Sequence, residues 1–331
     1  MRAVQIAELS GPTTALTLRE DLPEPPAEHP LTPGSGVIID VKAAGVSFPE
    51  LLQTRGAYQI KPDPPFIPGS EVGGVVREVH GSDDTHLEPG DRVAAFTTLG
   101  AWAQTAVAPT YFTFKIPDAW DYAQGAALVL NYHTAYFALI GRGRLAEGET
   151  VVVHGAAGGV GTASLQVAKA HGARTIGVVS SDAKEAVARE AGADEVVRAD
   201  GPWKDQVREM TDGGADLVLD PVGGDRFTDS LRSLREFGRV VVVGFTAGSI
   251  PEVRVNRLLL NNTEVIGAGW GASVIGWPAR TERIGREIEG LIEAGQVRPI
   301  IGARFPLEKA ADALVLLDER GATGKVVLDV A

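Results

Sequence analysis

The chain has 331 residues, of which 44% are hydrophobic and 22% are charged, so it is long enough for two domains of ordinary size. Its net charge of −12, with no basic block, argues against nucleic acid as a general partner, because an acidic surface repels a phosphate backbone. The absence of cysteine excludes disulfides, thiolate catalysis and zinc sites with sulfur ligands.

The N-terminal segment MRAVQIAELS lacks the apolar core of a secretory signal. The most apolar stretch, residues 125–140, is interrupted by Asn131 and His133 and is short for a membrane span. We therefore expect a buried helix there, no membrane partner and a cytoplasmic location.

Residues 1 to about 120 are rich in proline and glycine and carry short apolar runs at 37–41, 74–79 and 91–96. Turn formers such as Pro89-Gly90-Asp91 separate these runs. This pattern predicts a β-rich domain with little helix.

From residue 121 the pattern changes to strands that alternate with helices. A long helix is expected over 122–142, followed by short apolar strands at 150–154, 174–179, 195–197, 215–220, 239–243 and 264–266. Helices are expected between them at 162–171, 183–191, 203–210, 226–234 and 255–260. Buried strands separated by helices predict an α/β fold, with the doubly wound parallel sheet of a Rossmann domain.

The last part of the chain predicts two further helices, near 280–294 and 307–318, and a closing strand at 325–330. No internal repeat beyond the alternation of strands and helices is visible in the sequence.

The strongest local signal is a glycine-rich loop that directly follows the first strand of the parallel sheet. Its residues are Gly155, Ala156, Ala157, Gly158, Gly159, Val160 and Gly161. Glycines here allow unusual dihedral angles and a close approach of the pyrophosphate, and a helix N-terminus offers amides to it. The first glycine of the common G-x-G-x-x-G pattern is Ala156 in this chain. The context favours a dinucleotide site over a merely tight turn.

The end of the second strand indicates which dinucleotide binds. NAD enzymes commonly place an acidic residue there, whereas this chain has Ser180 and Ser181, with Lys184 shortly after. Hydroxyl and ammonium groups suit a 2′-phosphate, and Arg198 beyond the third strand is a further candidate ligand. Asp182 could instead bind the ribose or cap the next helix. We therefore expect NADPH rather than NADH.

These segments resemble the zinc-independent quinone oxidoreductases (zeta-crystallin type) of the medium-chain dehydrogenase/reductase superfamily. The resemblance covers the whole chain and rests on segments in the family's order: AAGVSFPELLQTRGAY (43–58), PFIPGSEVGGVV (65–76), LNYHTAYFAL (130–139), HGAAGGVG (154–161), DLVLDPVGG (216–224), GRVVVVGF (238–245), LLLNNTEVIGAGWG (258–271) and TGKVVL (323–328).

The resemblance implies a GroES-like catalytic domain from residues 1–121 and 272–331, with a Rossmann NADP-binding domain at 122–271 between them. It also implies a cofactor cleft between the domains and a homodimer formed through the edge strand at 264–269. Zinc-dependent relatives carry metal ligands where this chain has Ser47 and Ser70, and the four-cysteine zinc lobe is absent. We therefore expect no metal and reject a zinc alcohol dehydrogenase.

Site residues follow from the resemblance position by position. Ser47 stands where quinone reductases often have asparagine beside the nicotinamide, and Phe48 replaces a common tyrosine. Tyr58 matches a family tyrosine near the substrate. The cofactor-binding set that the resemblance implies also includes Asn131, Val222, Gly223, Phe245 and Arg320.

The resemblance implies that hydride passes from NADPH to a quinone. Tyr58 is the first candidate proton or hydrogen-bond donor and Tyr132 the second. For either tyrosine, a packing role is favoured somewhat over acid catalysis. Two alternatives remain open: reduction of the C=C bond of enals, enones or enoyl thioesters, and an NADPH-binding protein with structural or regulatory duty. The six histidines form no metal set; we expect His133 and His154 to pack internally and His29, His80, His86 and His171 to lie on the surface.

Overall fold

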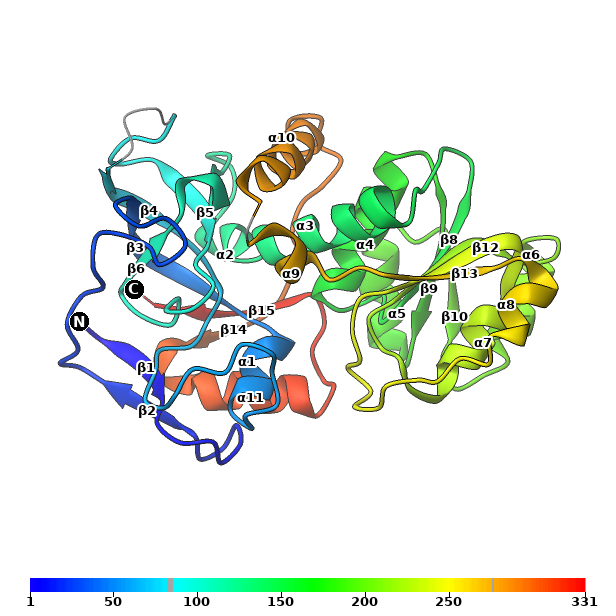
Figure 1. The fold of residues 1–331 in the computed structure, drawn as a ribbon, viewed down its shortest axis with the longest axis horizontal. Coiled ribbons are helices and arrows are strands. Elements are labelled where there is room, and N and C mark those ends of the chain that lie inside the picture. Colours follow the sequence, from blue (N-terminus) through cyan, green and yellow to red (C-terminus); the bar gives the residue numbers. More distant parts are fainter. Residues whose placement is uncertain (82–85, 276, 331) are drawn as a thin grey trace. The chain divides into compact units, whose positions relative to one another are not determined.

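The computed structural model describes residues 1–81, 86–275 and 277–330. The chain divides into two compact units (Figure 1). Unit 1 comprises Met1–Leu130, Ile275–Arg283 and Pro299–Ala331, and unit 2 comprises Asn131–Val274 and Ile284–Arg298. Each unit has its own sheet and its own buried apolar core.

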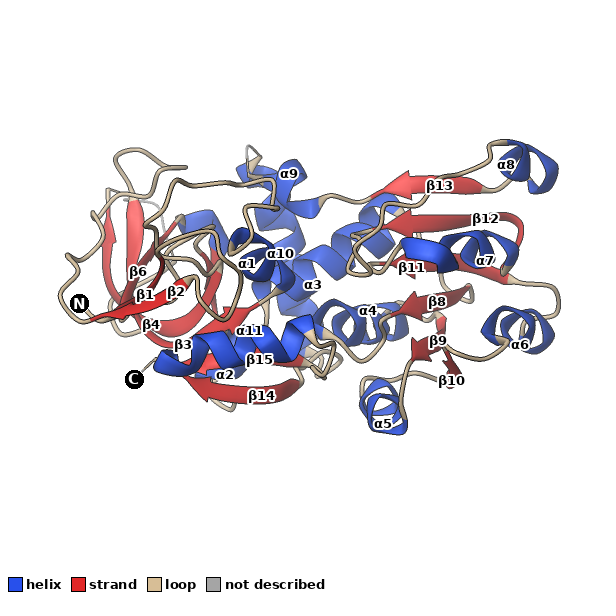
Figure 2. Ribbon diagram, turned by 90° about the horizontal axis from the view of Figure 1, so that it is seen from below, coloured by secondary structure: helices blue, strands red, loops and turns tan. Residues whose placement is uncertain are grey.

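Unit 2 contains a six-stranded parallel sheet. Its strands are β8 (Thr150–His154), β9 (Arg174–Val179), β10 (Glu195–Arg198), β11 (Ala215–Asp220), β12 (Leu234–Val242) and β13 (Glu264–Gly267). They lie in the order β10-β9-β8-β11-β12-β13, as Figure 2 shows, with every neighbouring pair parallel. In chain order this is 3-2-1-4-5-6, the arrangement of the Rossmann fold, so the predicted fold class is confirmed.

The helices of this unit follow its strands in turn, as the alternation in the sequence predicted. They are α4 (Gly159–Ala170), α5 (Asp182–Glu190), α6 (Trp203–Met210), α7 (Phe227–Arg232), α8 (Asn256–Asn261) and α9 (Trp270–Val274), while α10 (Pro278–Glu293) begins in unit 1 and continues into unit 2. The strands form because runs such as Val151, Val152 and Val153 have no exposed side chain and need cover on both faces.

The single helix expected over 122–142 is wrong, because three pieces occupy that segment. They are α2 (Tyr122–Gly125), α3 (Val129–Tyr136) and a π-helical turn over Phe137–Arg142. The first piece ends with hydrogen bonds between residues three positions apart, in which the amides of Ala127 and Leu128 donate to the carbonyl oxygens of Gln124 and Gly125. Its backbone packs directly on a strand, since a Cβ on Gly73 would lie 2.0 Å from the carbonyl oxygen of Tyr122.

Unit 1 is β-rich, as predicted. Its main sheet has the order β14-β15-β3-β4-β5-β7, with β6 also paired to β3, and β1 and β2 form a separate pair. The bounds are β1 (Ala3–Ile6), β2 (Leu16–Arg19), β3 (Gly36–Val46), β4 (Glu71–His80), β5 (Arg92–Phe96), β6 (Thr105–Ala108), β7 (Thr113–Lys115), β14 (Ile301–Pro306) and β15 (Lys325–Asp329). Its helices include α1 (Phe48–Gln53) and α11 (Ala310–Asp318).

The end of the chain returns to this first sheet. Strand β15 pairs antiparallel with β3, so that Val326 lies opposite Val46. This register places Lys325 beside the end of β3, where Ser47 begins the next helix. Strand β14, which the sequence analysis missed, lies at the sheet edge and alternates half-buried and exposed residues, a weaker signal than a buried run.

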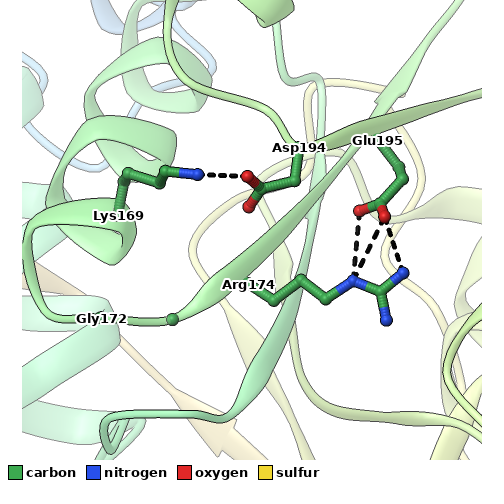
Figure 3. Close-up of a pocket in the computed structure, with 6 residues that line it drawn as sticks. Lys169, Gly172, Arg174, Asp194 and Glu195 are labelled. Carbon is green, nitrogen blue, oxygen red and sulfur yellow. Dashed lines mark hydrogen bonds and ion pairs between the residues drawn. The ribbon is translucent and has the colours of Figure 1, made fainter.

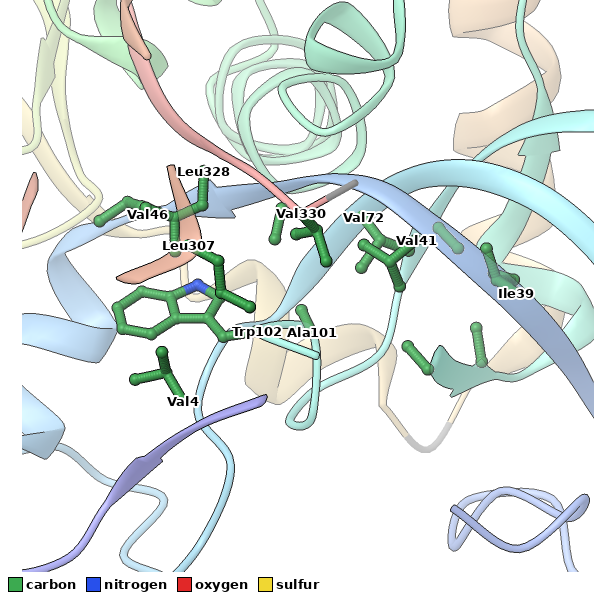
Figure 4. Packing of buried hydrophobic residues seen from close by; sticks show 14 of the residues in the cluster. Val4, Ile39, Val41, Val46, Val72, Ala101, Trp102, Leu307, Leu328 and Val330 are labelled. Atoms are coloured by element: carbon green, nitrogen blue, oxygen red, sulfur yellow. The ribbon is translucent and has the colours of Figure 1, made fainter. Parts of the chain in front are cut away.

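The core of unit 1 surrounds Trp102, whose indole N–H donates to the carbonyl oxygen of Gly45 at 2.9 Å. Figure 4 shows the aliphatic side chains around it, among them Val4, Val46, Leu307 and Leu328. The surface position expected for His29 is wrong: the side chain is 2% exposed, and its ring nitrogens bond to the carbonyl of Thr97 and the amide of Leu31.

Candidate functional site

The glycine-rich loop of unit 2 connects β8 to α4, as the sequence predicted. Gly155 adopts a positive φ of 59°, which glycine tolerates best, and Gly158 is the N-cap of the helix. A Cβ on Gly161 would lie 2.1 Å from the carbonyl oxygen of Gly155, so only glycine lets the helix pack this closely on the loop. The helix therefore begins against the end of the strand with its first amides available to an anion.

The first turn of α4 is lined by a side chain from the helix before the sheet. A Cβ on Gly159 would lie 2.9 Å from Nδ2 of Asn131, so Asn131 occupies the space beside the loop. The structure thus brings Asn131 together with the glycine loop.

A second loop reaches the same edge of the sheet from the end of β11. The buried carboxylate of Asp220 accepts the amide hydrogens of Val222 and Gly223, both at 2.8 Å, and this holds the loop in place. A Cβ on Gly223 would lie 2.9 Å from Cδ1 of Phe245, while the place of a Cβ on Gly155 lies 3.4 Å from Cγ2 of Val222. These predicted residues therefore gather at the carboxyl ends of β8, β11 and β12, where ligands of doubly wound sheets bind.

The predicted phosphate ligands meet at the carboxyl end of β9. Nζ of Lys184 lies 3.2 Å from Oγ of Ser180, and the Arg198 guanidinium donates to the carbonyl oxygen of Ser180 at 2.9 Å. Ser181 caps α5, and Asp182 forms an ion pair with Arg198. The helix cap that we had considered for Asp182 is therefore supplied by Ser181. One hydroxyl and two cations converge, and the carboxylates of Asp182 and Asp200 partly offset the charge of Arg198.

Unit 1 contains a buried polar network that the sequence analysis did not anticipate. Glu50 accepts the amide hydrogen of Ser47 at 2.8 Å and the hydroxyl hydrogen of Ser70 at 2.7 Å. Lys325 donates to Oγ of Ser47 at 2.6 Å and forms an ion pair with Glu71. The network thus joins both positions at which zinc-dependent relatives carry metal ligands.

The ionisable groups of this network are almost completely buried. Glu50 and Glu71 are each 1% exposed and Lys325 is 3% exposed. Burial raises the pKa of Glu50, and the nearby ammonium of Lys325 offsets part of that rise. Charges are costly in such a place unless they are paired or hydrogen-bonded; Lys325 and Glu71 pair with each other, and Glu50 accepts two hydrogen bonds. In the sequence, the ion pair between Glu71 and Lys325 leaves one signal: each is an isolated charged residue at the start of an apolar strand.

The two tyrosines proposed as donors differ in their surroundings. Tyr58 is half-buried in unit 1, and burial together with the Glu50 carboxylate raises the pKa of its phenol, which keeps it neutral. Tyr132 is 2% exposed, and its hydroxyl donates to Oε1 of Gln166 at 2.8 Å. The geometry of Tyr132 favours the packing role that already weighed more than acid catalysis.

The remaining predicted groups fall in several places. Arg320 lies in unit 1 just beyond α11, with a positive φ of 58°. His154 is buried, as expected, with Nε2 2.9 Å from Oγ of Ser230 and its ring edge-on to Trp203. His133 is also buried and packs edge-on against Trp270. Among the residues that the structure describes, no group of three or more histidine, cysteine, aspartate or glutamate residues could hold a metal ion.

Figure 3 shows a surface hollow of unit 2 that is not the dinucleotide site. It is lined by Lys169, Gly172, Ala173, Arg174, Asp194 and Glu195. Its charges are paired with one another, Lys169 with Asp194 and Arg174 with Glu195. The hollow lies at the amino ends of β9 and β10, opposite to the edge where such sheets bind ligands.

The fold and the glycine loop define a dinucleotide-binding protein with a second, β-rich unit. Family models agree: "Alcohol dehydrogenase GroES-like domain" matches residues 33–118, and "Zinc-binding dehydrogenase" matches residues 159–284. None of the helices within the described ranges is sufficiently long and apolar to cross a membrane.

Relatives of known identity match nearly the whole chain. The rat quinone oxidoreductase is 34% identical over 333 residues, covering 99% of this chain and 97% of its own. The solved structure of a probable oxidoreductase from Mycobacterium abscessus has a TM-score of 0.88 at 40% identity, covering 100% and 99%. The quinone oxidoreductase of Thermus thermophilus, solved also with NADPH, has a TM-score of 0.84 at 34% identity, covering 100% of both chains. This chain belongs to the quinone oxidoreductase family of the medium-chain dehydrogenase/reductase superfamily.

Proposed function

We propose that this chain is an NADPH-dependent oxidoreductase that reduces quinones without a catalytic zinc ion. The observation that carries the cofactor part is the convergence of Ser180, Lys184 and Arg198 at the end of β9. A 2′-phosphate is a dianion that charge-assisted hydrogen bonds from these groups would stabilise, whereas the 2′-hydroxyl of NADH carries no charge for them to bind. The NADPH complex of the Thermus thermophilus relative supports the same choice.

The loop between β8 and α4 would hold the pyrophosphate. This role is supported by the close packing at Gly159 and Gly161, where a Cβ would meet Asn131 and the loop backbone. When bound, NADPH supplies the hydride. The chain's residues orient the cofactor through the loop amides, Asn131 and the groups at the end of β9, and exclude water from the reacting atoms.

The polar network of unit 1 supports a quinone or another conjugated acceptor. Conjugation spreads the incoming negative charge over the acceptor, so hydrogen-bond donors are enough to stabilise it. An isolated ketone would require a metal ion to stabilise the same charge. Ser47 and Tyr58 lie in this unit and carry neutral donor hydroxyls. The same donors suit the C=C bond of an enone or enal, which is the second candidate reaction because it leaves charge on a carbonyl oxygen in the same way.

We also propose that the protein is a homodimer formed through β13. This strand is the last of the parallel sheet, and Val265 on it is 37% exposed. Helix α8 precedes it and exposes Leu259 and Leu260 at 76% and 75%. An unpaired edge beside exposed leucines is a surface that a second copy would cover. Light scattering should give twice the chain mass, and Val265→Lys should give a monomer; a monomeric wild type would contradict the proposal.

The experiment that tests the function is NADPH oxidation, run in parallel with NADH, against a panel of quinones, enones and enals. Turnover of quinones with a preference for NADPH is the expected result. Turnover of enones or enals alone would select the second reaction. Tight NADPH binding without reduction of any acceptor would reject both and favour a binding protein.

A further inference from the structure

Ser47 is the most exposed member of the buried polar network in unit 1. The other four members, Glu50, Ser70, Glu71 and Lys325, are all at most 7% exposed, whereas Ser47 is only half-buried. Its Oγ accepts a hydrogen bond from Nζ of Lys325 at 2.6 Å. A serine hydroxyl that accepts one hydrogen bond retains its own hydrogen for donation. Half-buried Ser47 is therefore the residue through which the buried charge can act on a bound molecule.

The ammonium of Lys325 is held firmly in its position. Its partner Glu71 also accepts the amide hydrogen of Leu130 at 3.1 Å, which fixes the carboxylate. A Cβ on Gly45 would lie 2.6 Å from Cγ of Glu71, so the neighbouring strand leaves this side chain no other place. Because the effective dielectric constant is low inside a protein, a cation held this way polarises the hydroxyl that it touches.

We propose that Lys325 is a positioning residue that makes the Ser47 hydroxyl a hydrogen-bond donor to the acceptor oxygen that becomes negatively charged during reduction. The inference rests on the proposed function and adds a residue to it. The acceptor gains two electrons and one hydrogen as hydride from NADPH, which becomes NADP⁺, and its carbonyl oxygen becomes an oxyanion. Ser47 stabilises this oxyanion, and a proton from water then completes the reduction.

A purely structural ion pair between β4 and β15 would account for the link between Glu71 and Lys325. It would not require the bond from Lys325 to Ser47, nor a chain that ends on a half-buried hydroxyl at the position of a metal ligand in zinc-dependent relatives. The two accounts therefore differ in what the loss of charge does to the acceptor, and not in what it does to folding.

The test compares Ser47→Ala, the double variant Lys325→Met with Glu71→Gln, and the variant that combines all three changes. The double variant removes Lys325 and its ion-pair partner together, so that Glu71 is not left as a buried carboxylate without its cation. We expect Ser47→Ala to lower kcat with an enone by about 10²-fold, the usual cost of losing one oxyanion donor. The double variant should lower it about tenfold, and the triple variant should resemble Ser47→Ala, because Lys325 acts through Ser47.

Two features separate this result from a structural effect. The losses should be larger for weakly electrophilic enones than for strongly electrophilic quinones, and Lys325→Arg, which keeps the charge, should recover part of the loss. Losses that multiply in the triple variant, or that are equal for every acceptor, would overturn the proposal.

A binding measurement keeps the proposal separate from the proposed function. Titration with 4-nitrophenol, followed by the absorbance of the phenolate, reports whether the protein with NADP⁺ prefers the anion. Wild type should favour the phenolate, and Ser47→Ala and the double variant should not. If no acceptor is reduced but this preference is seen, the function fails and the donor site stands. If the wild type and Ser47→Ala bind the phenolate equally, the donor site is overturned whatever the turnover.

Discussion

The two units build their sites in different ways. The candidate pyrophosphate site of unit 2 is made from backbone: a glycine loop, a helix N-terminus and two strand ends that lie within one parallel sheet. Unit 1 makes its site from side chains that are far apart in the sequence, since Lys325 and Ser47 are separated by 278 positions. A backbone site leaves a local sequence pattern, because glycine is required at fixed spacing. A side-chain network leaves only scattered polar residues in apolar surroundings.

The largest expected effect is on the stability of unit 1. Lys325→Met leaves Glu71 buried without its partner and should lower the free energy of unfolding by about 3–5 kcal/mol. Adding Glu71→Gln should restore most of this loss. The control is Lys309→Met, since Lys309 and Asp312 form an exposed pair worth at most about 1 kcal/mol. Denaturant unfolding measures all three. Equal losses at Lys325 and Lys309 would show that the network does not hold the unit together.

The next effect is on cofactor binding by unit 2. Gly161→Ala forces a Cβ to within 2.1 Å of the Gly155 carbonyl oxygen and should weaken NADPH binding by about 10²-fold or more, with a stability loss of about 1–3 kcal/mol. Gly158→Ala is the matched control for stability, because its Cβ would be 3.4 Å from the nearest atom. Fluorescence titration and thermal unfolding would check both. Unchanged NADPH binding in Gly161→Ala would contradict the importance of the loop.

Acid should lower the stability of unit 2 through buried His133. Burial lowers the pKa of His133 to about 3, below the 6.5 of an unhindered histidine, so the native state holds this ring neutral. Because the pKa is lower in the folded state, stability is present above pH 6.5 and is lost as the pH falls. Between pH 7 and pH 5 wild type should lose about 2 kcal/mol more than His133→Phe. Denaturant unfolding at the two pH values measures this difference; equal losses in the two proteins would contradict the assignment.

The smallest effect should be on cofactor choice. Lys184→Ala removes one cation beside Ser180 and should weaken NADPH binding about tenfold, or ~1.4 kcal/mol, while NADH binding stays the same. NADH is thus the internal control for any change in the loop itself. An equal loss for both dinucleotides would place the 2′-phosphate elsewhere.

The sequence predicted the parts of the fold that local patterns determine. The bounds of β8, β9 and β11 agree with prediction because each is a short run with an apolar centre, bounded by glycines or polar residues. The helix over 122–142 was wrong because the segment forms three pieces, and the contact of the first piece with Gly73 is long-range and leaves no mark in the local pattern. His29 was misplaced for the same reason: its partner Thr97 is 68 residues away.

The site residues also divide into those that a local pattern predicted and those that depend on long-range pairing. Asn131, Gly155, Gly161, Val222, Gly223 and Phe245 gather at one edge of the sheet, as the pattern and the family resemblance implied. The network of Glu50, Ser70, Glu71 and Lys325 was missed, because no spacing in the sequence shows that β15 pairs with β3. Pairing of that kind is decided by the burial of whole strands, which a local motif does not record.

The most direct test of the central claim is the steady-state oxidation of NADPH and NADH by the purified protein with a simple quinone as acceptor. We predict turnover with NADPH that clearly exceeds turnover with NADH, and reduction of the quinone in step with loss of the cofactor's absorbance. Oxidation of neither cofactor with any quinone, enone or enal, in a protein that still binds NADPH, would contradict it.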